Sequence, residues 1–118
     1  MTAKVVLNVR RGNALTSIID IKGELTSSAE DQLMQAYRQA SNPDARTIIL
    51  NFSELEYMNS SGIGLLVTLL IRVNRQKRRL LAYGLSEHYQ HIFKLTRLDE
   101  AIAIYKTEAE ALAAAHGA

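Results

Sequence analysis

Hydrophobic and polar residues alternate near the start of the chain in a pattern typical of β-strands. Every second residue from Val5 to Val9 is apolar, so residues 4–10 have a period of two. The segment 11–14, which contains Gly and Asn and is typical of a turn, separates this run from a second β-rich run at residues 15–23. We therefore predict an antiparallel hairpin in this part of the chain.

Downstream of the hairpin, helical patterns alternate with short β-rich runs. Ser27 and Glu30 have the spacing of a capping box, so a helix is predicted to start there and to end before Pro43. The further predicted elements are a buried strand at 47–52, a mostly buried helix at 63–71, a strand at 79–83, a short helix capped by Ser86, a strand at 101–105, and a terminal helix with a second capping box at Thr107 and Glu110. This order implies parallel βαβ units beside the hairpin, that is, an α/β fold with a mixed sheet and about four helices.

Length and composition narrow the class of protein. A chain of 118 residues with 47% hydrophobic residues is expected to form one domain with a single core. The absence of cysteine excludes disulfides, thiolate catalysis and cysteine-ligated zinc. No secretory leader is visible, and the longest apolar run is too short to span a bilayer. We expect a soluble cytoplasmic protein whose single domain covers residues 1–118, with its core at about 4–112 and a short C-terminal tail.

The net charge of +2 is unevenly distributed. The segment 72–79 contains Arg72, Arg75, Lys77, Arg78 and Arg79 and no acidic residue. Such a run could attract phosphate, nucleic acid or an acidic partner. It could equally be the solvated C-terminal end of a helix, where cations complement the helix dipole. Because no aromatic residue is interleaved with the run, we favour the second interpretation and expect no nucleic-acid site.

The residues offer no convincing set of catalytic or metal-binding groups. His88 and His91 lie three positions apart on one predicted helix, but no third metal ligand is evident nearby. Gly62 and Gly64 lack the third glycine of a dinucleotide-binding motif, and the chain contains no P-loop. We therefore expect neither an enzyme nor a cofactor or metal site.

The stretch 54–64, between the strand at 47–52 and the helix that follows, contains the strongest candidate site. We predict a polar loop that delivers Ser60 and Ser61 to the N-terminus of the helix, where serine is a preferred cap. Unpaired N–H groups and the positive end of the dipole also make this position suitable for an anion. Gly62 and Gly64 are expected to leave the backbone uncrowded, so that another protein can approach Ser61. From the residues alone, an ordinary capped helix with a small-residue turn is the favoured interpretation.

The segment Met58–Gly64, with the sequence Met-Asn-Ser-Ser-Gly-Ile-Gly, resembles the signature of the STAS family of sulphate transporters and anti-sigma factor antagonists. Stand-alone bacterial members carry an apolar-Asp-Ser-Ser-Gly-apolar-Gly segment between a strand and a helix. A second block at 91–99 resembles the late helix of the family and its exit loop. The resemblance extends from about Lys4 to about Leu112. The usual aspartate of the family is replaced by Asn59.

The resemblance implies an anti-sigma factor antagonist that binds an anti-sigma factor with ATP-dependent serine kinase activity. The serine before the glycine, here Ser61, would be the phosphorylated residue, and a phosphatase would reset it. Ser60 is the less favoured candidate for phosphorylation, because its hydroxyl is expected to be engaged in capping the helix. The expected partner-binding residues are Glu54, Glu56, Tyr57, Met58, Asn59, Ser60, Ser61, Gly62, Ile63 and Gly64.

Asn59 leaves an alternative function open. An asparagine keeps the shape and hydrogen bonding of aspartate but lacks its charge and its capacity as a general base. Phosphorylation could then be slower or absent. In that case the chain would be a non-switching STAS scaffold or interaction subunit, in a stressosome-like assembly or beside a transporter. Weak homodimerisation is compatible with either function.

Overall fold

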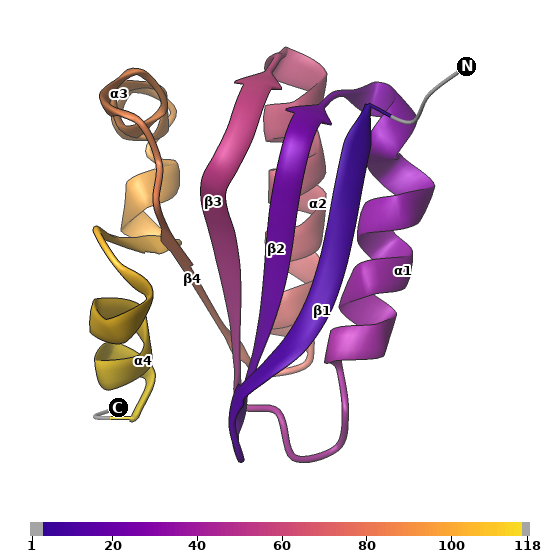
Figure 1. Cartoon of the computed structure of the whole chain (residues 1–118), viewed down its shortest axis with the longest axis vertical. Coiled ribbons are helices and arrows are strands. Elements are labelled where there is room, and N and C mark those ends of the chain that lie inside the picture. Colours follow the sequence, from indigo (N-terminus) through magenta and orange to yellow (C-terminus); the bar gives the residue numbers. More distant parts are fainter. Residues whose placement is uncertain (1–3, 117–118) are drawn as a thin grey trace.

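The sheet extends sideways from the N-terminal hairpin in the order of the sequence. The computed structural model describes residues 4–116, in which five strands lie in the order β1-β2-β3-β4-β5 (Figure 1). Their bounds are β1 (Val5–Asn13), β2 (Thr16–Leu25), β3 (Thr47–Met58), β4 (Arg79–Tyr83) and β5 (Ala103–Tyr105). β1 and β2 are antiparallel, and every later neighbouring pair is parallel. The prediction of a mixed sheet with a hairpin at one side is confirmed.

Four α-helices connect or follow the strands in the described part of the chain. They are α1 (Glu30–Ala40), α2 (Ser60–Arg75), α3 (Glu87–Leu95) and α4 (Glu108–His116), with single 3₁₀ turns η1 (Ser27–Ala29) and η2 (Leu98–Glu100). α1 and α2 cover one face of the sheet, and α4 packs over β4 and β5 on the other face (Figure 1). The tail expected after residue 112 is helical up to His116, and residues 117–118 lie outside the described range.

The period of two along the parallel strands divides the buried side chains into two clusters. Ile48, Leu50 and Phe52 of β3 belong to the larger core, which they share with α1, α2 and α3. Ile49, between them, belongs to a smaller core under α4 that also contains Ala111. Because these strands are covered on both faces, their sequences are nearly continuously apolar.

β3 is longer than predicted, because the polar stretch 54–58 is its second half and not a loop. This half of β3 pairs with the end of β2, where Lys22 is opposite Glu54 and Leu25 is opposite Met58. The pairing of β3 with β4 reaches only as far as Asn51. The second half of β3 therefore has a strand on one side only. Its outward positions are polar for that reason, which made it look like a loop.

The helix starts agree with the predictions at two of four places, of which the start of α2 is described below. The hydroxyl of Ser86 accepts a hydrogen bond from the Tyr89 amide at the start of α3. At α4, Thr107 Oγ1 accepts from the Glu110 amide at 3.2 Å. The predicted capping box at Ser27 and Glu30 is wrong, because neither η1 nor α1 has a side-chain cap. Residues 27–29 form the 3₁₀ turn η1, and α1 begins only at Glu30. Ser27 and Glu30 are therefore not the N-cap and the third residue of one helix, as a capping box requires.

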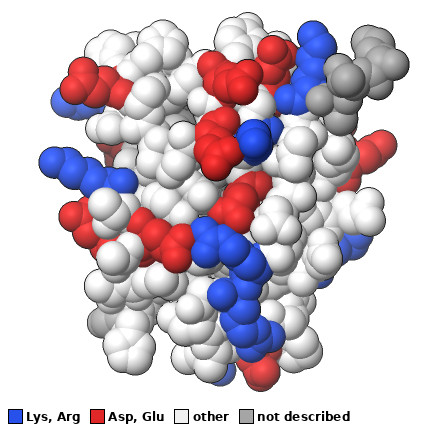
Figure 2. Space-filling view, viewed as in Figure 1, with Lys and Arg blue, Asp and Glu red and all other residues white. Residues whose placement is uncertain are grey.

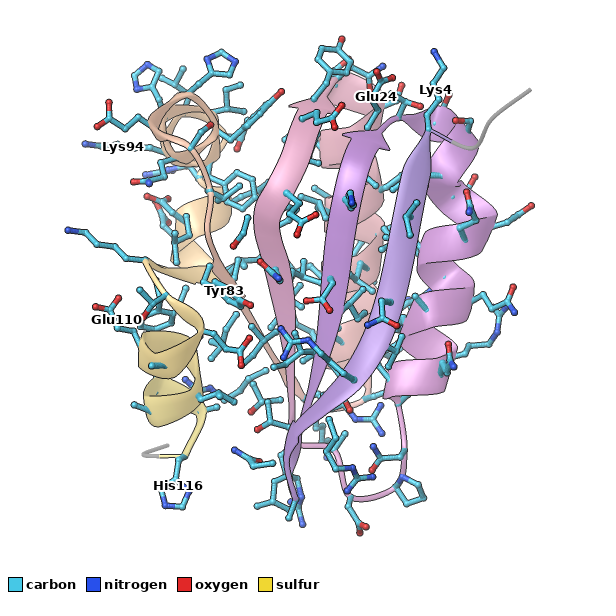
Figure 3. All side chains as sticks on the ribbon, viewed as in Figure 1. Lys4, Glu24, Tyr83, Lys94, Glu110 and His116 are labelled. Atoms are coloured by element: carbon cyan, nitrogen blue, oxygen red, sulfur yellow. The ribbon has the colours of Figure 1, made fainter. Side chains whose placement is uncertain are left out.

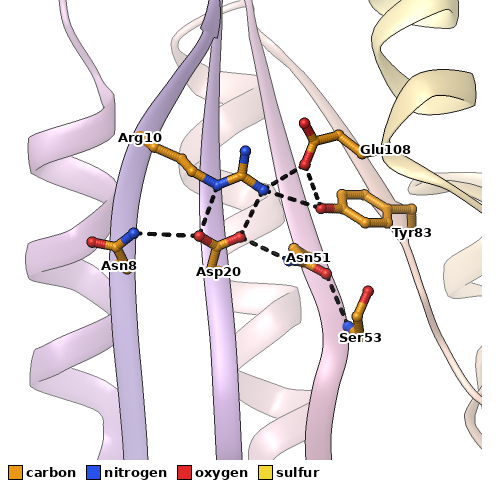
Figure 4. A network of polar contacts seen from close by, with 7 residues as sticks. All are labelled: Asn8, Arg10, Asp20, Asn51, Ser53, Tyr83 and Glu108. Atoms are coloured by element: carbon orange, nitrogen blue, oxygen red, sulfur yellow. Dashed lines mark hydrogen bonds and ion pairs between the residues drawn. The ribbon is translucent and has the colours of Figure 1, made fainter.

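The face of the sheet opposite α1 and α2 carries charged side chains of both signs close together (Figure 2). α4 lies at the lower left of this view, against β4 and β5, and Tyr83 is the last residue of β4 (Figure 3). Arg10 of β1 donates to Asp20 at 2.8 Å and also to Glu108 and Tyr83, so that α4 is connected to the hairpin (Figure 4). Asn51 donates to the other oxygen of Asp20 at 2.8 Å.

These contacts shift the acidity of the groups that make them. Burial opposes the charge of Asp20, but hydrogen bonds from Arg10 and Asn51 hold its pKa below the usual value. Hydrogen bonds from Arg10 and Tyr83 lower the pKa of Glu108. Burial and the hydrogen bond to Glu108 raise the pKa of Tyr83 to about 12. At neutral pH, Asp20 and Glu108 are therefore charged and Tyr83 is neutral.

Candidate functional site

A single residue, Asn59, connects the end of β3 to the start of α2. Its backbone is extended, and its side-chain oxygen accepts the amide hydrogen of Gly62 at 2.9 Å. Its carbonyl oxygen accepts from the Ile63 amide at 3.0 Å. The prediction that a serine caps this helix is therefore wrong, and Asn59 is the N-cap. Asparagine and aspartate cap helices about equally well, so this position keeps its structural role without the negative charge.

Ser60 and Ser61 are the first two residues of α2, and both are exposed. Neither hydroxyl has a hydrogen-bond partner within residues 4–116, so the expectation that the Ser60 hydroxyl is engaged by the backbone is wrong. The amides of both serines also lack an acceptor in the described chain, and the first turn of α2 contains no acidic residue. Two free hydroxyls and two free amides therefore lie at the positive end of the helix.

The two glycines after the serines have different surroundings. A Cβ atom on Gly62 would lie 2.1 Å from the carbonyl oxygen of Leu25 and 2.8 Å from Met58 Cγ. Gly62 is thus required for close packing of α2 on the end of β2, and not for access to Ser61. Gly64 is exposed, and a Cβ there would have no atom within 4 Å. The expected open surface therefore exists at Gly64 only.

The last residues of β3 lie next to the start of α2 in the chain and differ in their exposure. Glu54, Glu56 and Tyr57 are exposed, whereas Met58 is buried. The Met58 amide donates to the hydroxyl of Tyr89 on α3 at 2.8 Å. Met58 thereby fixes the end of the strand against the core, and Tyr57 next to it projects outward.

The exposure of two apolar residues of α2 was not predicted from the sequence. Val67 and Ile71 of α2 are 38% and 50% exposed, although the helix was expected to be mostly buried. Together with Gly64 they have the spacing i, i+3 and i+7, which places them along one side of the helix. A helix that packs on one face of a sheet can bury only part of its circumference, so a helix that is apolar all round must expose some apolar residues. We call Ser60, Ser61, Gly64, Val67 and Ile71 the α2 surface.

Residues 5–111 match the family model of the STAS domain. The chain belongs to the STAS domain family.

Relatives of this STAS domain include the anti-sigma-B factor antagonist of Staphylococcus aureus, which is 27% identical over 93 residues, or 78% of this chain and 86% of the relative. An anti-sigma factor antagonist from Mycobacterium paratuberculosis has a similar structure, with a TM-score of 0.81 and 19% identity, covering 95% of this chain and 94% of that one. The Bacillus cell fate determinant SpoIIAA in its phosphorylated form has a TM-score of 0.70 and 26% identity, covering 91% and 96%.

His88 and His91 are exposed on α3, and within residues 4–116 no three His, Cys, Asp or Glu side chains are arranged to hold a metal ion. The described part of the chain also has no helix with both the length and the apolar character needed to cross a bilayer.

The basic run 72–79 differs from the predicted solvated helix end at Arg78 and Arg79. Arg79 is the first residue of β4 and donates to the carbonyl oxygen of Ala114 at 3.3 Å. Arg78 donates to the carbonyl oxygens of Asn42 and Ala45 at 3.1 and 2.8 Å, and also to the side chains of Tyr37 and Gln76. All four acceptors are neutral. Arg78 is therefore held in place with its charge uncompensated.

Proposed function

We propose that this STAS domain is an anti-sigma factor antagonist that binds an anti-sigma factor through the α2 surface and is switched off by phosphorylation of Ser61. The observation that carries the proposal is an exposed serine with a free hydroxyl at the start of an exposed, partly apolar helix. Relatives named as anti-sigma factor antagonists support it, and one of them has been solved in a phosphorylated form. The chain would be a binding partner and a kinase substrate, not a catalyst. Because sigma factors act on RNA polymerase, we place this activity in the cytoplasm.

The surface has the composition of a protein interface. Val67 and Ile71 of the α2 surface are 38% and 50% exposed, and Tyr57 at the end of β3 is 48% exposed. Exposed apolar and aromatic residues are typical of interface cores. Gly64 has open space above it, which allows a partner to approach the helix backbone. Glu54 and Glu56 on β3 add negative charge at the same end of the domain. These features favour a partner with an apolar contact patch and a positively charged border.

Phosphorylation at this position would weaken binding without unfolding the domain. A phosphate adds about −1.5 to −2 charges and three acceptor oxygens. At the N-terminus of α2 the free amides and the dipole would stabilise it by about 0.3–1 kcal/mol. Between two docked proteins the same charge has to be desolvated, which costs several kcal/mol. The partner would therefore be released while the fold is retained.

Asn59 is compatible with this switch. Its hydrogen bond to the Gly62 amide gives the helix the same start that an aspartate would give. What it lacks is a carboxylate near the hydroxyl that receives the phosphate. We therefore expect Asn59→Asp to speed phosphorylation and to leave the affinity of the unmodified protein nearly unchanged.

The test uses the purified anti-sigma factor kinase encoded in the same genome. Incubation with ATP followed by mass spectrometry should place one phosphate on Ser61, and Ser61→Ala should abolish it while Ser60→Ala does not. In titration calorimetry, Ser61→Asp should weaken binding by about thirty-fold or more, which corresponds to at least about 2 kcal/mol.

Thermal melts of the same variant provide the control for folding. Ser61→Asp should change the free energy of unfolding by no more than about 1 kcal/mol, since a carboxylate is favourable in the first turn of a helix. If Ser61→Asp binds the kinase as tightly as the wild type, the start of α2 is not the regulated contact. A phosphate that remains in Ser61→Ala would show that another residue is the acceptor.

A further inference from the structure

At the opposite end of α2 from Ser61, we propose a binding site for a small anion that carries two or more phosphate groups. A surface hollow of about 520 Å³ lies between the C-terminal ends of α1 and α2. Small-molecule sites typically have volumes of about 300–1,000 Å³. The hollow is lined by Tyr37, Arg38, Ser41, Arg72, Arg75 and Gln76. Each of these side chains can donate hydrogen bonds, and none is acidic.

The three arginines of the hollow have no acidic partner. Within residues 4–116, no carboxylate oxygen lies within 4.0 Å of Arg38, Arg72 or Arg75. The face of the sheet on the other side of the domain differs, because there basic and acidic side chains lie next to one another (Figure 2). Three guanidinium groups outweigh the two helix C-termini, which contribute about half a negative charge each. The hollow is therefore electropositive, and guanidinium forks match phosphate oxygens in two-point contacts.

A buried hydroxyl lies next to the hollow. Ser41 Oγ is buried and has no hydrogen-bond partner in the described structure. A buried polar group without a partner is unfavourable, and most such groups in proteins are satisfied. Ser41 Oγ lies below the surface of the hollow, so a phosphate oxygen could accept from it only after its side chain rotates.

The amide of Gln76 is oriented so that it can donate as well. Its Oε1 atom contacts both the hydroxyl of Tyr37 and the guanidinium of Arg78. A guanidinium group can only donate, so the atom that it contacts must be the carbonyl oxygen. The amide nitrogen of Gln76 is then left to donate elsewhere. Arg78 itself is bound by neutral acceptors and adds another positive charge beside the hollow.

Lys77 follows the end of α2 with a φ of 59°, a left-handed conformation in which glycine is usual, and it lines a different hollow from the three arginines. A small polyphosphate fits these features better than a nucleic acid. The lining contains one aromatic residue, Tyr37, and its side chain is only 3% exposed, so it cannot stack on bases.

Titration calorimetry with the isolated full-length protein tests the proposal, and no partner protein is needed. The result is therefore independent of the proposed function at Ser61. The probes are inorganic phosphate, pyrophosphate and tripolyphosphate, with citrate as a carboxylate of comparable charge. Tripolyphosphate is expected to bind with a Kd below about 1 mM in 0.1 M NaCl, more tightly than pyrophosphate and at least about tenfold more tightly than citrate.

Two variants locate the site. Arg72→Gln should weaken tripolyphosphate binding by about tenfold or more, whereas Arg46→Gln removes an exposed arginine outside the hollow and should change binding less than about threefold. A second variant in the hollow, Arg75→Gln, should weaken tripolyphosphate binding by about tenfold or more as well.

Three results would overturn the proposal. The first is no detectable heat with tripolyphosphate up to about 10 mM, well above the expected Kd. The second is equal weakening by Arg72→Gln and Arg46→Gln, which would indicate diffuse attraction to a basic surface. The third is binding of duplex DNA that is tighter than binding of tripolyphosphate and is weakened by both Arg72→Gln and Arg46→Gln. That result would show that these arginines bind a nucleic-acid backbone.

Discussion

The two glycines at the start of α2 should respond in opposite ways to substitution by alanine. In Gly62→Ala, the new methyl group would lie 2.1 Å from a backbone oxygen of Leu25 and 2.8 Å from Met58 Cγ. Carbon atoms in van der Waals contact are about 3.5–4.0 Å apart, so α2 and the end of β2 must separate. In Gly64→Ala, the new methyl group meets no atom within 4 Å.

The expected magnitudes follow from these surroundings. Alanine is favoured over glycine within a helix by about 1 kcal/mol, and this gain applies to both positions. Gly64→Ala should therefore stabilise the domain by about 0.5–1 kcal/mol. At Gly62, overpacking against the backbone should cost about 3 kcal/mol, which leaves a net loss of about 2 kcal/mol. The two variants should thus differ by about 3 kcal/mol.

Urea unfolding followed by circular dichroism measures this difference. With a slope of about 1.5 kcal/mol/M, the midpoints of the two variants should lie about 2 M apart, on opposite sides of the wild-type midpoint. The double variant should be close to the sum of the two effects, because the methyl groups have no shared neighbour. If Gly62→Ala is as stable as Gly64→Ala, then α2 does not pack on Leu25 as described, and the position of Ser61 would need to be reconsidered.

Three further predictions concern the cap of α2, its C-terminal end and the network under α4. Asn59→Ala should destabilise the domain by about 1 kcal/mol, because the Gly62 amide loses its acceptor, whereas Asn59→Asp should be neutral or slightly stabilising in urea unfolding. Lys77→Gly should raise the free energy of unfolding by about 0.5–1 kcal/mol by relieving the positive φ, and a lower melting temperature would contradict this. The lowered pKa values of Asp20 and Glu108 mean that their stabilising contribution is present above their ordinary values near 4 and is lost as pH falls through the lowered ones. Glu108→Gln should therefore be less stable than the wild type at pH 7, by a difference that shrinks in melts at about pH 3; a constant difference would show that the ion pair is not responsible.

Local patterns in the sequence predicted most of the fold. The hairpin, the strand order along the chain and the caps at Ser86 and Thr107 each depend on residues close together in sequence. The second half of β3 was missed because its pairing with Lys22–Leu25 is non-local, and its exposed side gives it a polar composition. The exposed side of α2 was missed for a related reason, since an apolar sequence does not say which side remains uncovered.

The candidate site was located by the sequence, but its details were not. Ser60 and Ser61 were placed correctly at the start of a helix that follows a strand, but a loop was expected from residue 54, where β3 continues to Met58. The cap was assigned to a serine because several residues there cap helices about equally well, and only the end of β3 at Met58 decides that it is Asn59. The hollow between α1 and α2 brings together Arg38 and Ser41 with residues more than thirty positions later, which no local pattern indicates.

The hydrogen bond between the Met58 amide and the Tyr89 hydroxyl has a consequence for biosynthesis. Its two ends are 31 residues apart, and α3 is made after β3, α2 and β4. The second half of β3 has no strand on the side facing α3, so this helix completes its support. Ribosomes add about 5–20 residues per second, so the segment carrying Ser61 leaves the ribosome seconds before its final anchor exists. A kinase that recognises the finished end of β3 and α2 would therefore modify only chains that have completed folding, and nascent chains would be spared.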